Sequence, residues 1–118
     1  MGACNFEAYA IGKDAKSAFL KAREEAQWES GHGGYTGTIA EKDSFIMFVR
    51  TPRKSWGKCV NELMDMETGN KTIDDKWGPA GCMDITKEIR AELKAGKRNG
   101  PKIPRGQKYF VFFGMASC

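Results

Sequence analysis

Phe45-Ile46-Met47-Phe48-Val49 is an unbroken apolar run, preceded by the polar turn Glu41-Lys42-Asp43-Ser44 and followed by Pro52. An apolar run of this length, without alternating polar residues, is typical of a strand that is buried on both faces. The aromatic and β-branched run Lys108–Met115 (KYFVFFGM) predicts a terminal strand. Strands of this kind need helices to cover them, and the segments around them carry helical patterns.

The longest helical pattern covers residues 15–30. Its apolar residues recur at three- and four-residue steps and fall on one face: Ala15, Ala18, Phe19, Ala22 and Ala26. Asp14 is suited to cap the first turn of this helix. Before it, residues 3–11 alternate with period two, which predicts a strand that ends at Gly12.

Two shorter helices are expected further along the chain. The patterns predict them over residues 55–68 and 87–95, with Ser55 and Thr86 as their N-caps. Gly96 is placed to end the later helix, because glycine accepts the left-handed conformation that often follows a helix.

Short strands are further expected at Thr38-Ile39, which opens the segment leading to Phe45, and over residues 82–85. Strands interleaved with helices predict an α+β fold, with a mixed β-sheet of about four to five strands and two to three helices packed on it. The length of 118 residues predicts a single domain, 1–118. Within it, residues 97–107 (KRNGPKIPRGQ) form a basic loop or arm that contains Pro and Gly.

The composition limits the setting in which this chain works. No stretch approaches the roughly 18 apolar residues of a membrane span, and the N-terminus carries no signal-peptide pattern, so we expect a cytoplasmic protein without a membrane. The four cysteines lie far apart without a C-x-x-C pair. They are most simply free thiols in a reducing compartment, with a disulfide pair or a metal site as the alternatives. No metal and no cofactor is expected.

Positive charge is concentrated in one part of the chain. Residues 87–108 hold eight basic residues against two acidic ones, so this segment carries +6 and the remainder of the chain −2 of the net +4. Such a concentration suits an anionic partner, although a solvated loop is the plain alternative. The residues expected to contact an anion, within the basic segment 94–108, are Lys97, Arg98, Lys102 and Arg105.

A glycine-rich stretch, Gly31 to Thr38, lies between the first helix and the next strand. Glycine lets backbone amides approach a ligand closely, and neighbouring hydroxyls can add contacts. The candidate ligand-binding residues are His32, Gly33, Gly34, Tyr35, Thr36, Gly37 and Thr38. In this hypothesis Tyr35 stacks on a base and His32 donates or accepts a hydrogen bond. The alternative is a long helix-to-strand connection with a purely structural role.

Catalysis is the less favoured interpretation, and no catalytic residue is assigned. The glycine-rich stretch follows a helix, whereas phosphate-binding loops lead into a helix N-terminus, and both nucleotide-binding fingerprints are missing. His32, the only histidine, could act as a general base in a small hydrolase, but no spacing connects it to a nucleophile or to an orienting carboxylate.

Two blocks resemble a known group of proteins. Residues 25–42 (EAQWESGHGGYTGTIAEK) and the closing residues 112–117 (FFGMAS) are similar to small uncharacterised proteins of phages and prophages. The resemblance covers about a third of the chain and carries no catalytic assignment. It implies a phage-type accessory protein that acts in the bacterial host cell, where such proteins are often non-enzymatic inhibitors or sequestering proteins directed at host defence.

Together these features predict a small non-enzymatic binding protein for an anionic, nucleotide-derived ligand, held by the 31–38 loop and the basic segment and thereby sequestered from host defence. A nucleic-acid-binding module and a protein–protein inhibitor of a host factor are the alternatives. We also expect a homo-oligomer, because an apolar C-terminal strand with an unprotected edge would need covering.

Overall fold

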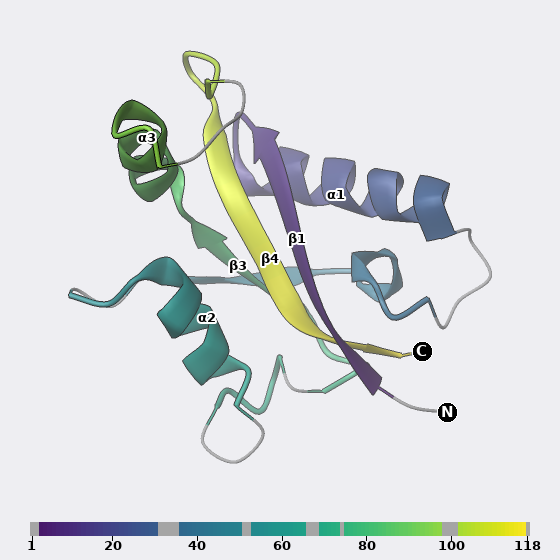
Figure 1. The fold of residues 1–118 in the computed structure, drawn as a ribbon. Coiled ribbons are helices and arrows are strands. Elements are labelled where there is room, and N and C mark those ends of the chain that lie inside the picture. Colours follow the sequence, from purple (N-terminus) through teal and green to yellow (C-terminus); the bar gives the residue numbers. More distant parts are fainter. Residues whose placement is uncertain are drawn as a thin grey trace.

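A computed structural model describes residues 3–30, 36–50, 53–65, 69–73, 75–97 and 102–117. The elements follow one another as β1 (Ala3–Gly12), α1 (Ala15–Ser30), η1 (Ile39–Glu41), β2 (Phe45–Phe48), α2 (Trp56–Leu63), β3 (Ala80–Asp84), α3 (Thr86–Lys94) and β4 (Lys108–Ser117). One four-stranded mixed sheet with three α-helices is an α+β arrangement, which confirms the predicted fold class (Figure 1).

The strands are ordered β1-β4-β3-β2 across the sheet. β4 is antiparallel to both β1 and β3, and β2 runs parallel to β3. β4 pairs with β1 along its whole length, from Lys108 opposite Gly12 to Ser117 opposite Ala3. The C-terminal strand therefore lies in the interior of the sheet, paired on both sides. The reason given for self-association, an unprotected edge on this strand, is wrong.

Helices cover both faces of the sheet, and Figure 1 shows α1 on one side and α2 and α3 on the other. Alternation along β4 divides the core accordingly, because neighbouring side chains point to opposite faces. Phe110 and Phe112 pack with α1, whereas Val111 and Phe113 pack with α2 and α3. Gly81 lies against Phe113, and a Cβ atom there would come within 2.4 Å of the Phe113 ring. A larger residue at Gly81 would thus force the buried Phe113 ring to move.

Most predicted helix ends are confirmed. The Asp14 carboxylate accepts the Ser17 N–H at 2.8 Å, and this bond lowers the pKa of Asp14. Ser55 caps α2, and Gly96 follows α3 with φ +74°. Thr86 is the first residue of α3 and does not cap it. The predicted helix over 55–68 is shorter in the structure, since α2 ends at Leu63; residues 66–68 lie outside the described part.

Two strand predictions are wrong. The segment expected to open a strand at Thr38 forms the 3-10 helix η1 instead, because the Thr38 side chain accepts the Ala40 N–H and caps that turn. β2 is not buried on both faces, since it lies at the edge of the sheet, where Ile46 is 38% and Met47 is 48% exposed.

The cysteines divide into two groups. Cys59 and Cys82 are buried free thiols, and burial raises the pKa of Cys82 to about 12. Cys4 is disulfide-bonded, so the expectation of free thiols does not hold for it. Within the described ranges no helix is long and apolar enough to cross a membrane, and no three His, Cys, Asp or Glu side chains are grouped to hold a metal ion.

Candidate anion-binding groove

An open groove of about 670 Å³ lies where β2 and β3 end and β4 begins. Parallel strands bring their carboxyl ends to one edge of a sheet, and ligands of open α/β sheets commonly bind outside these ends. The groove is lined from three parts of the chain: 47–50 after and within β2, 84–90 around the start of α3, and 106–108 at the start of β4.

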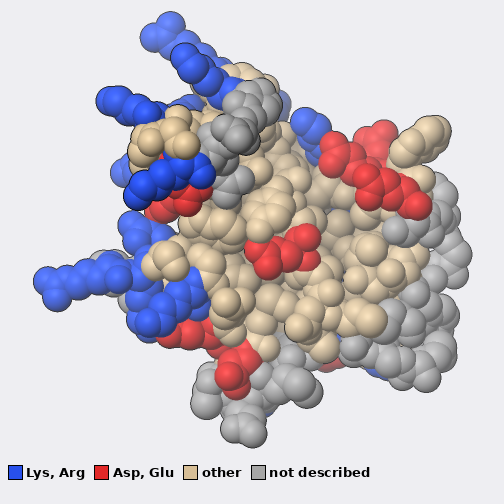
Figure 2. Space-filling view, viewed as in Figure 1, with Lys and Arg blue, Asp and Glu red and all other residues tan. Residues whose placement is uncertain are grey.

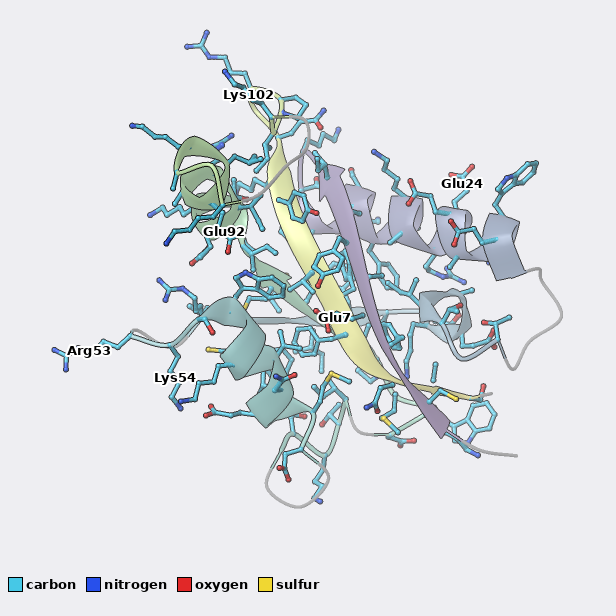
Figure 3. The ribbon with its side chains drawn as sticks, in the orientation of Figure 1. Glu7, Glu24, Arg53, Lys54, Glu92 and Lys102 are labelled. Atoms are coloured by element: carbon cyan, nitrogen blue, oxygen red, sulfur yellow. The ribbon has the colours of Figure 1, made fainter. Side chains whose placement is uncertain are left out.

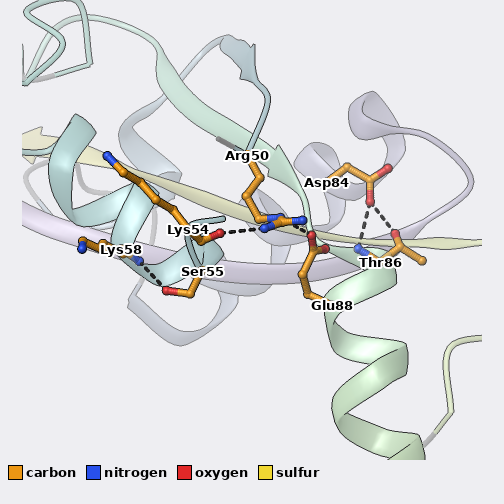
Figure 4. A network of polar contacts seen from close by, with 7 residues as sticks. All are labelled: Arg50, Lys54, Ser55, Lys58, Asp84, Thr86 and Glu88. Carbon is orange, nitrogen blue, oxygen red and sulfur yellow. Dashed lines mark hydrogen bonds and ion pairs between the residues drawn. The ribbon is translucent and has the colours of Figure 1, made fainter. Parts of the chain in front are cut away.

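A polar network fixes the junction between α3 and β4, and Figure 4 shows its bonds between Asp84 and Thr86. Asp84 Oδ1 accepts the Thr86 N–H at 3.0 Å and also the Thr86 hydroxyl. The Tyr109 N–H donates to Thr86 Oγ1 at 2.9 Å, and the Ile85 N–H donates to the Tyr109 carbonyl. These bonds place the first turn of α3 beside Lys108, so that both contribute to the groove.

Arg50, which follows β2, connects the β2 side of the groove to α3 and to the segment before α2. Its Nη1 donates to the Lys54 carbonyl at 2.7 Å, and its Nε pairs with the Glu88 carboxylate (Figure 4). Arg90, two residues further along α3 than Glu88, donates to the Gln107 carbonyl at 3.4 Å. The guanidinium groups are thereby held at the groove while part of each remains exposed.

The charge lining the groove is positive. Four basic side chains line it, and two carboxylates oppose them: Arg50, Lys87, Arg90 and Lys108 against Asp84 and Glu88. Neither Lys87 nor Lys108 has a carboxylate partner among the described residues. Met47, Phe48 and Val49 supply an apolar wall. This combination suits an anion that also carries an apolar or aromatic part.

Basic residues continue beyond the groove. Figure 2 shows Lys and Arg gathered over α2, α3 and the start of β4, whereas Asp and Glu cluster over α1. Figure 3 places Arg53, Lys54 and Lys102 on this basic side and Glu24 on the far side. Lys54 is paired with Glu62, which raises the pKa of Lys54, while Arg53 and Lys102 are exposed.

Part of this surface was missed from the sequence. Residues 50–58 (RTPRKSWGK) hold four basic residues, namely Arg50, Arg53, Lys54 and Lys58, and this density is the signal that could have found them. Lys58 stands 36 positions before Lys94, the start of the basic segment 94–108, and the fold brings Arg50 and Lys108 to one groove. Of the basic residues predicted to contact an anion, Lys97, Lys102 and Arg105 are exposed, Figure 3 places Lys102 on the basic side, and Arg98 lies outside the described residues.

The described part of the glycine-rich stretch is bonded within the chain. The Gly37 N–H donates to the Ser117 carbonyl at 2.8 Å, with Gly37 at φ +70°. Thr38 Oγ1 lies 2.7 Å from Thr36 Oγ1, which donates to a Glu41 carboxylate oxygen at 2.8 Å. These hydroxyls stabilise the turn into η1. The other predicted ligand residues, His32, Gly33, Gly34 and Tyr35, lie outside the described residues, and their role stays a prediction.

Lys42 extends this bonded region to the loop before β3. Its side chain is buried, and Nζ donates to the carbonyls of Asp75, Lys76 and Gly78 at 3.3, 3.2 and 2.8 Å. Nζ also lies 6.0 Å from the centre of the Phe6 ring. Burial lowers the pKa of Lys42, and the nearby Asp75 charge partly opposes that shift. The ammonium group thus fastens the loop to the chain around η1.

Gly37 and the basic groove lie at opposite ends of β4. Gly37 bonds to Ser117, whereas Lys108 lines the groove. Ten residues of strand span about 30 Å at roughly 3.3 Å per residue, so Gly37 and Lys108 are too far apart to contact one small ligand within a subunit.

Comparisons with known proteins add no further assignment: the chain matches no protein-family model, no curated protein and no solved structure.

Proposed function

We propose that this protein is a non-enzymatic binding protein for a nucleotide-derived, phosphate-bearing ligand, and that the ligand lies in the groove between β2, α3 and the start of β4. The observation that carries this proposal is the convergence of Arg50, Lys87, Arg90 and Lys108 from three separate segments on one open groove. Charge brought together in this way is costly through mutual repulsion unless an anion offsets it.

The chemistry of the lining favours a nucleotide over a simple anion. Exposed lysines and held guanidinium groups suit phosphate oxygens, since charge-assisted hydrogen bonds to phosphate are the stronger class. The apolar wall of Met47, Phe48 and Val49 offers a surface for a base or a ribose. We place the protein in the bacterial cytoplasm, where the resemblance to phage proteins would make it a sequestering protein for a signal of host defence.

Isothermal titration calorimetry with nucleoside triphosphates and cyclic dinucleotides tests the proposal directly. The variant Lys87→Ser/Lys108→Ser removes two exposed lysines of the groove and should weaken binding by about tenfold or more, since two charge-assisted contacts are lost. The matched control is Lys16→Ser/Lys21→Ser, which removes two exposed lysines from α1 and should bind as the wild type does.

Two outcomes would overturn the groove as the site. One is the absence of binding heat for every nucleotide tested with the wild-type protein. The other is equal weakening by the groove variant and by the α1 control, which would mean that overall charge, rather than the groove, governs affinity. Weakening by His32→Ala or Tyr35→Ala, with the groove variant unaffected, would instead favour the 31–38 loop.

Nucleic acid is the second candidate ligand, and the extent of the basic surface favours it. Arg53, Lys58, Lys97 and Lys102 are exposed and do not line the groove, so the basic surface extends beyond it. Fluorescence anisotropy with single-stranded oligonucleotides of increasing length separates the two. Affinity that rises with length and falls steeply with salt indicates nucleic acid, because each neutralised phosphate releases counterions. Affinity that does not increase beyond one or two nucleotides favours the first candidate.

A further inference from the structure

We propose that two copies of this chain associate through β2, pairing as antiparallel strands about a two-fold axis at Met47. The proposal does not depend on the proposed ligand, but Met47 and Val49 also line the groove, so the dimer would bury part of its apolar wall against the second copy. It replaces the earlier reason for expecting an oligomer, since β4 is interior and β2 is an edge of the sheet.

The outer side of β2 offers backbone groups for pairing. The Ser44 carbonyl accepts the Ala80 N–H, so the backbone groups of Phe45 and Met47 point away from β3 in the alternating ladder. No described residue pairs with the outward groups of these two residues. An edge with such free groups is a template for another strand.

The side chains along this edge are apolar on both faces of the sheet. Ile46 is 38%, Met47 48% and Val49 92% exposed, and all three lie within four residues of the chain. The opposite edge, β1, carries the exposed polar residues Asn5 and Glu7, which are the kind of residues that discourage strand addition. Within the described strand β2, by contrast, the exposed side chains of Ile46 and Met47 are apolar and none is charged.

The order of residues around β2 favours a second copy as the occupant. The five apolar residues 45–49 are centred on Met47 and flanked by polar residues on both sides, so the segment is self-complementary in polarity. An antiparallel pair centred at Met47 sets apolar against apolar and polar against polar. Met47 faces Met47 of the second copy, and the other opposed pairs are Ile46 with Phe48, Phe45 with Val49 and Ser44 with Arg50.

Charge selects the antiparallel direction. Asp43 precedes the segment, and Arg50 and Arg53 follow it. Antiparallel pairing sets the acidic end of each strand beside the basic end of the other, whereas parallel pairing would set like charges side by side. The Asp43 side chain is 99% exposed and its ion pair with Arg23 is long, at 3.9 Å, so the carboxylate is accessible to a second copy.

Analytical ultracentrifugation from nanomolar to high micromolar concentration tests the association. The wild type should convert reversibly from monomer to dimer. Met47→Lys opposes two ammonium groups at the two-fold axis and should raise the dimer dissociation constant by about tenfold or more, since like charges directly opposite destabilise a strand pair. Trp28→Lys, which introduces the same charge at an exposed apolar residue of α1, should leave the dimer unchanged.

Circular dichroism of Met47→Lys separates loss of the dimer from loss of the fold. A second variant, Met47→Cys, should form a disulfide-linked dimer under mild oxidation beyond any seen with the wild type, because the two residues face one another across the axis. Tyr9→Cys, on the β1 edge, should not. A wild type that stays monomeric, a dimer insensitive to Met47→Lys, or cross-linking through Tyr9→Cys in place of Met47→Cys would overturn the proposal.

Discussion

At the Ser117 end of β4 the polar side chains bond to one another and to the backbone, whereas at the Lys108 end the basic side chains stay open to solvent. Thr36, Thr38 and Glu41 form a closed network, and the Lys42 ammonium is shared among three carbonyls. At the other end Lys87 and Lys108 line a groove without a carboxylate partner in the described ranges.

This difference separates polar groups that hold the fold from those available to a ligand. Polar groups that satisfy one another stabilise the native state and have little left to offer a ligand. Basic groups that are gathered and left open contribute little to stability and much to binding of an anion. Substitutions at the Ser117 end should therefore change stability, and those at the Lys108 end should change affinity.

The largest effect is expected from Lys42→Met. This change keeps the length of the buried side chain but leaves three backbone carbonyls without their donor, so unfolding should become easier by about 2 kcal/mol and the melting temperature should fall by about 8 °C. Differential scanning calorimetry measures the change. Lys13→Met, at an exposed lysine, serves as the control, and an unchanged midpoint for Lys42→Met would refute its structural role.

Thr38→Ala should have the next largest effect on stability. It removes the cap of η1 and the bond to Thr36, for a loss of about 1 kcal/mol measured by urea unfolding. Thr38→Ser retains the hydroxyl and should recover most of the loss. Neither variant should alter nucleotide binding in the groove. A large loss of affinity in Thr38→Ala would contradict the assignment of stability to the Ser117 end and of affinity to the Lys108 end.

Glu88→Gln is the test at the Lys108 end of β4. Its effect should be smaller than those above and should appear in nucleotide affinity rather than in stability. It releases Arg50 from its ion pair and removes a negative charge from the groove, so nucleotide affinity should rise by about threefold while stability changes by less than about 1 kcal/mol. Glu62→Gln breaks the ion pair with Lys54 outside the groove lining and is the control. Weaker binding in Glu88→Gln would mean that the ion pair positions Arg50 for the ligand.

The smallest effect is a pH dependence at the Ser117 end. Burial lowers the pKa of Lys42 below the 10.5 of an unfolded lysine. Between the two values the unfolded chain binds more protons, so stability rises with pH there, and this gain is lost as pH falls through the folded pKa. The difference in free energy of unfolding between the wild type and Lys42→Met should thus grow as the pH rises towards 10.5. Guanidinium unfolding at a series of pH values measures this difference. A difference that stays constant would show that Lys42 is not desolvated.

Much of the local structure was predictable because it depends on neighbouring residues. The small-residue stripe of α1, the caps at Asp14 and Ser55 and the period of β1 each lie within a few positions of the structure they specify. Thr38-Ile39 was misread as a strand because one hydroxyl-capped turn outweighs the extended preference of two β-branched residues.

The site was only partly predictable. The basic segment 94–108 is recognisable in the sequence. That residues 50–58 belong to the same basic surface becomes clear only from the fold, which pairs Arg50 with Glu88 at the end of β2. Likewise, the run 45–49 predicts a strand but not its position in the sheet. Packed layers cover the faces of an interior strand more completely than those of an edge strand, and β2 is an edge strand with only β3 beside it.

By itself the sequence determined the kind and place of most elements, the α+β class and the uneven distribution of charge, since periodicity, capping and composition are properties of short segments. The tertiary structure alone decided that β4 is central and β2 an edge, that Gly37 and Lys108 lie at opposite ends of β4, and that Arg50 and Lys108 share one groove. Strand order sets these relations, and it follows from the burial of both sheet faces by the whole chain rather than from any local pattern.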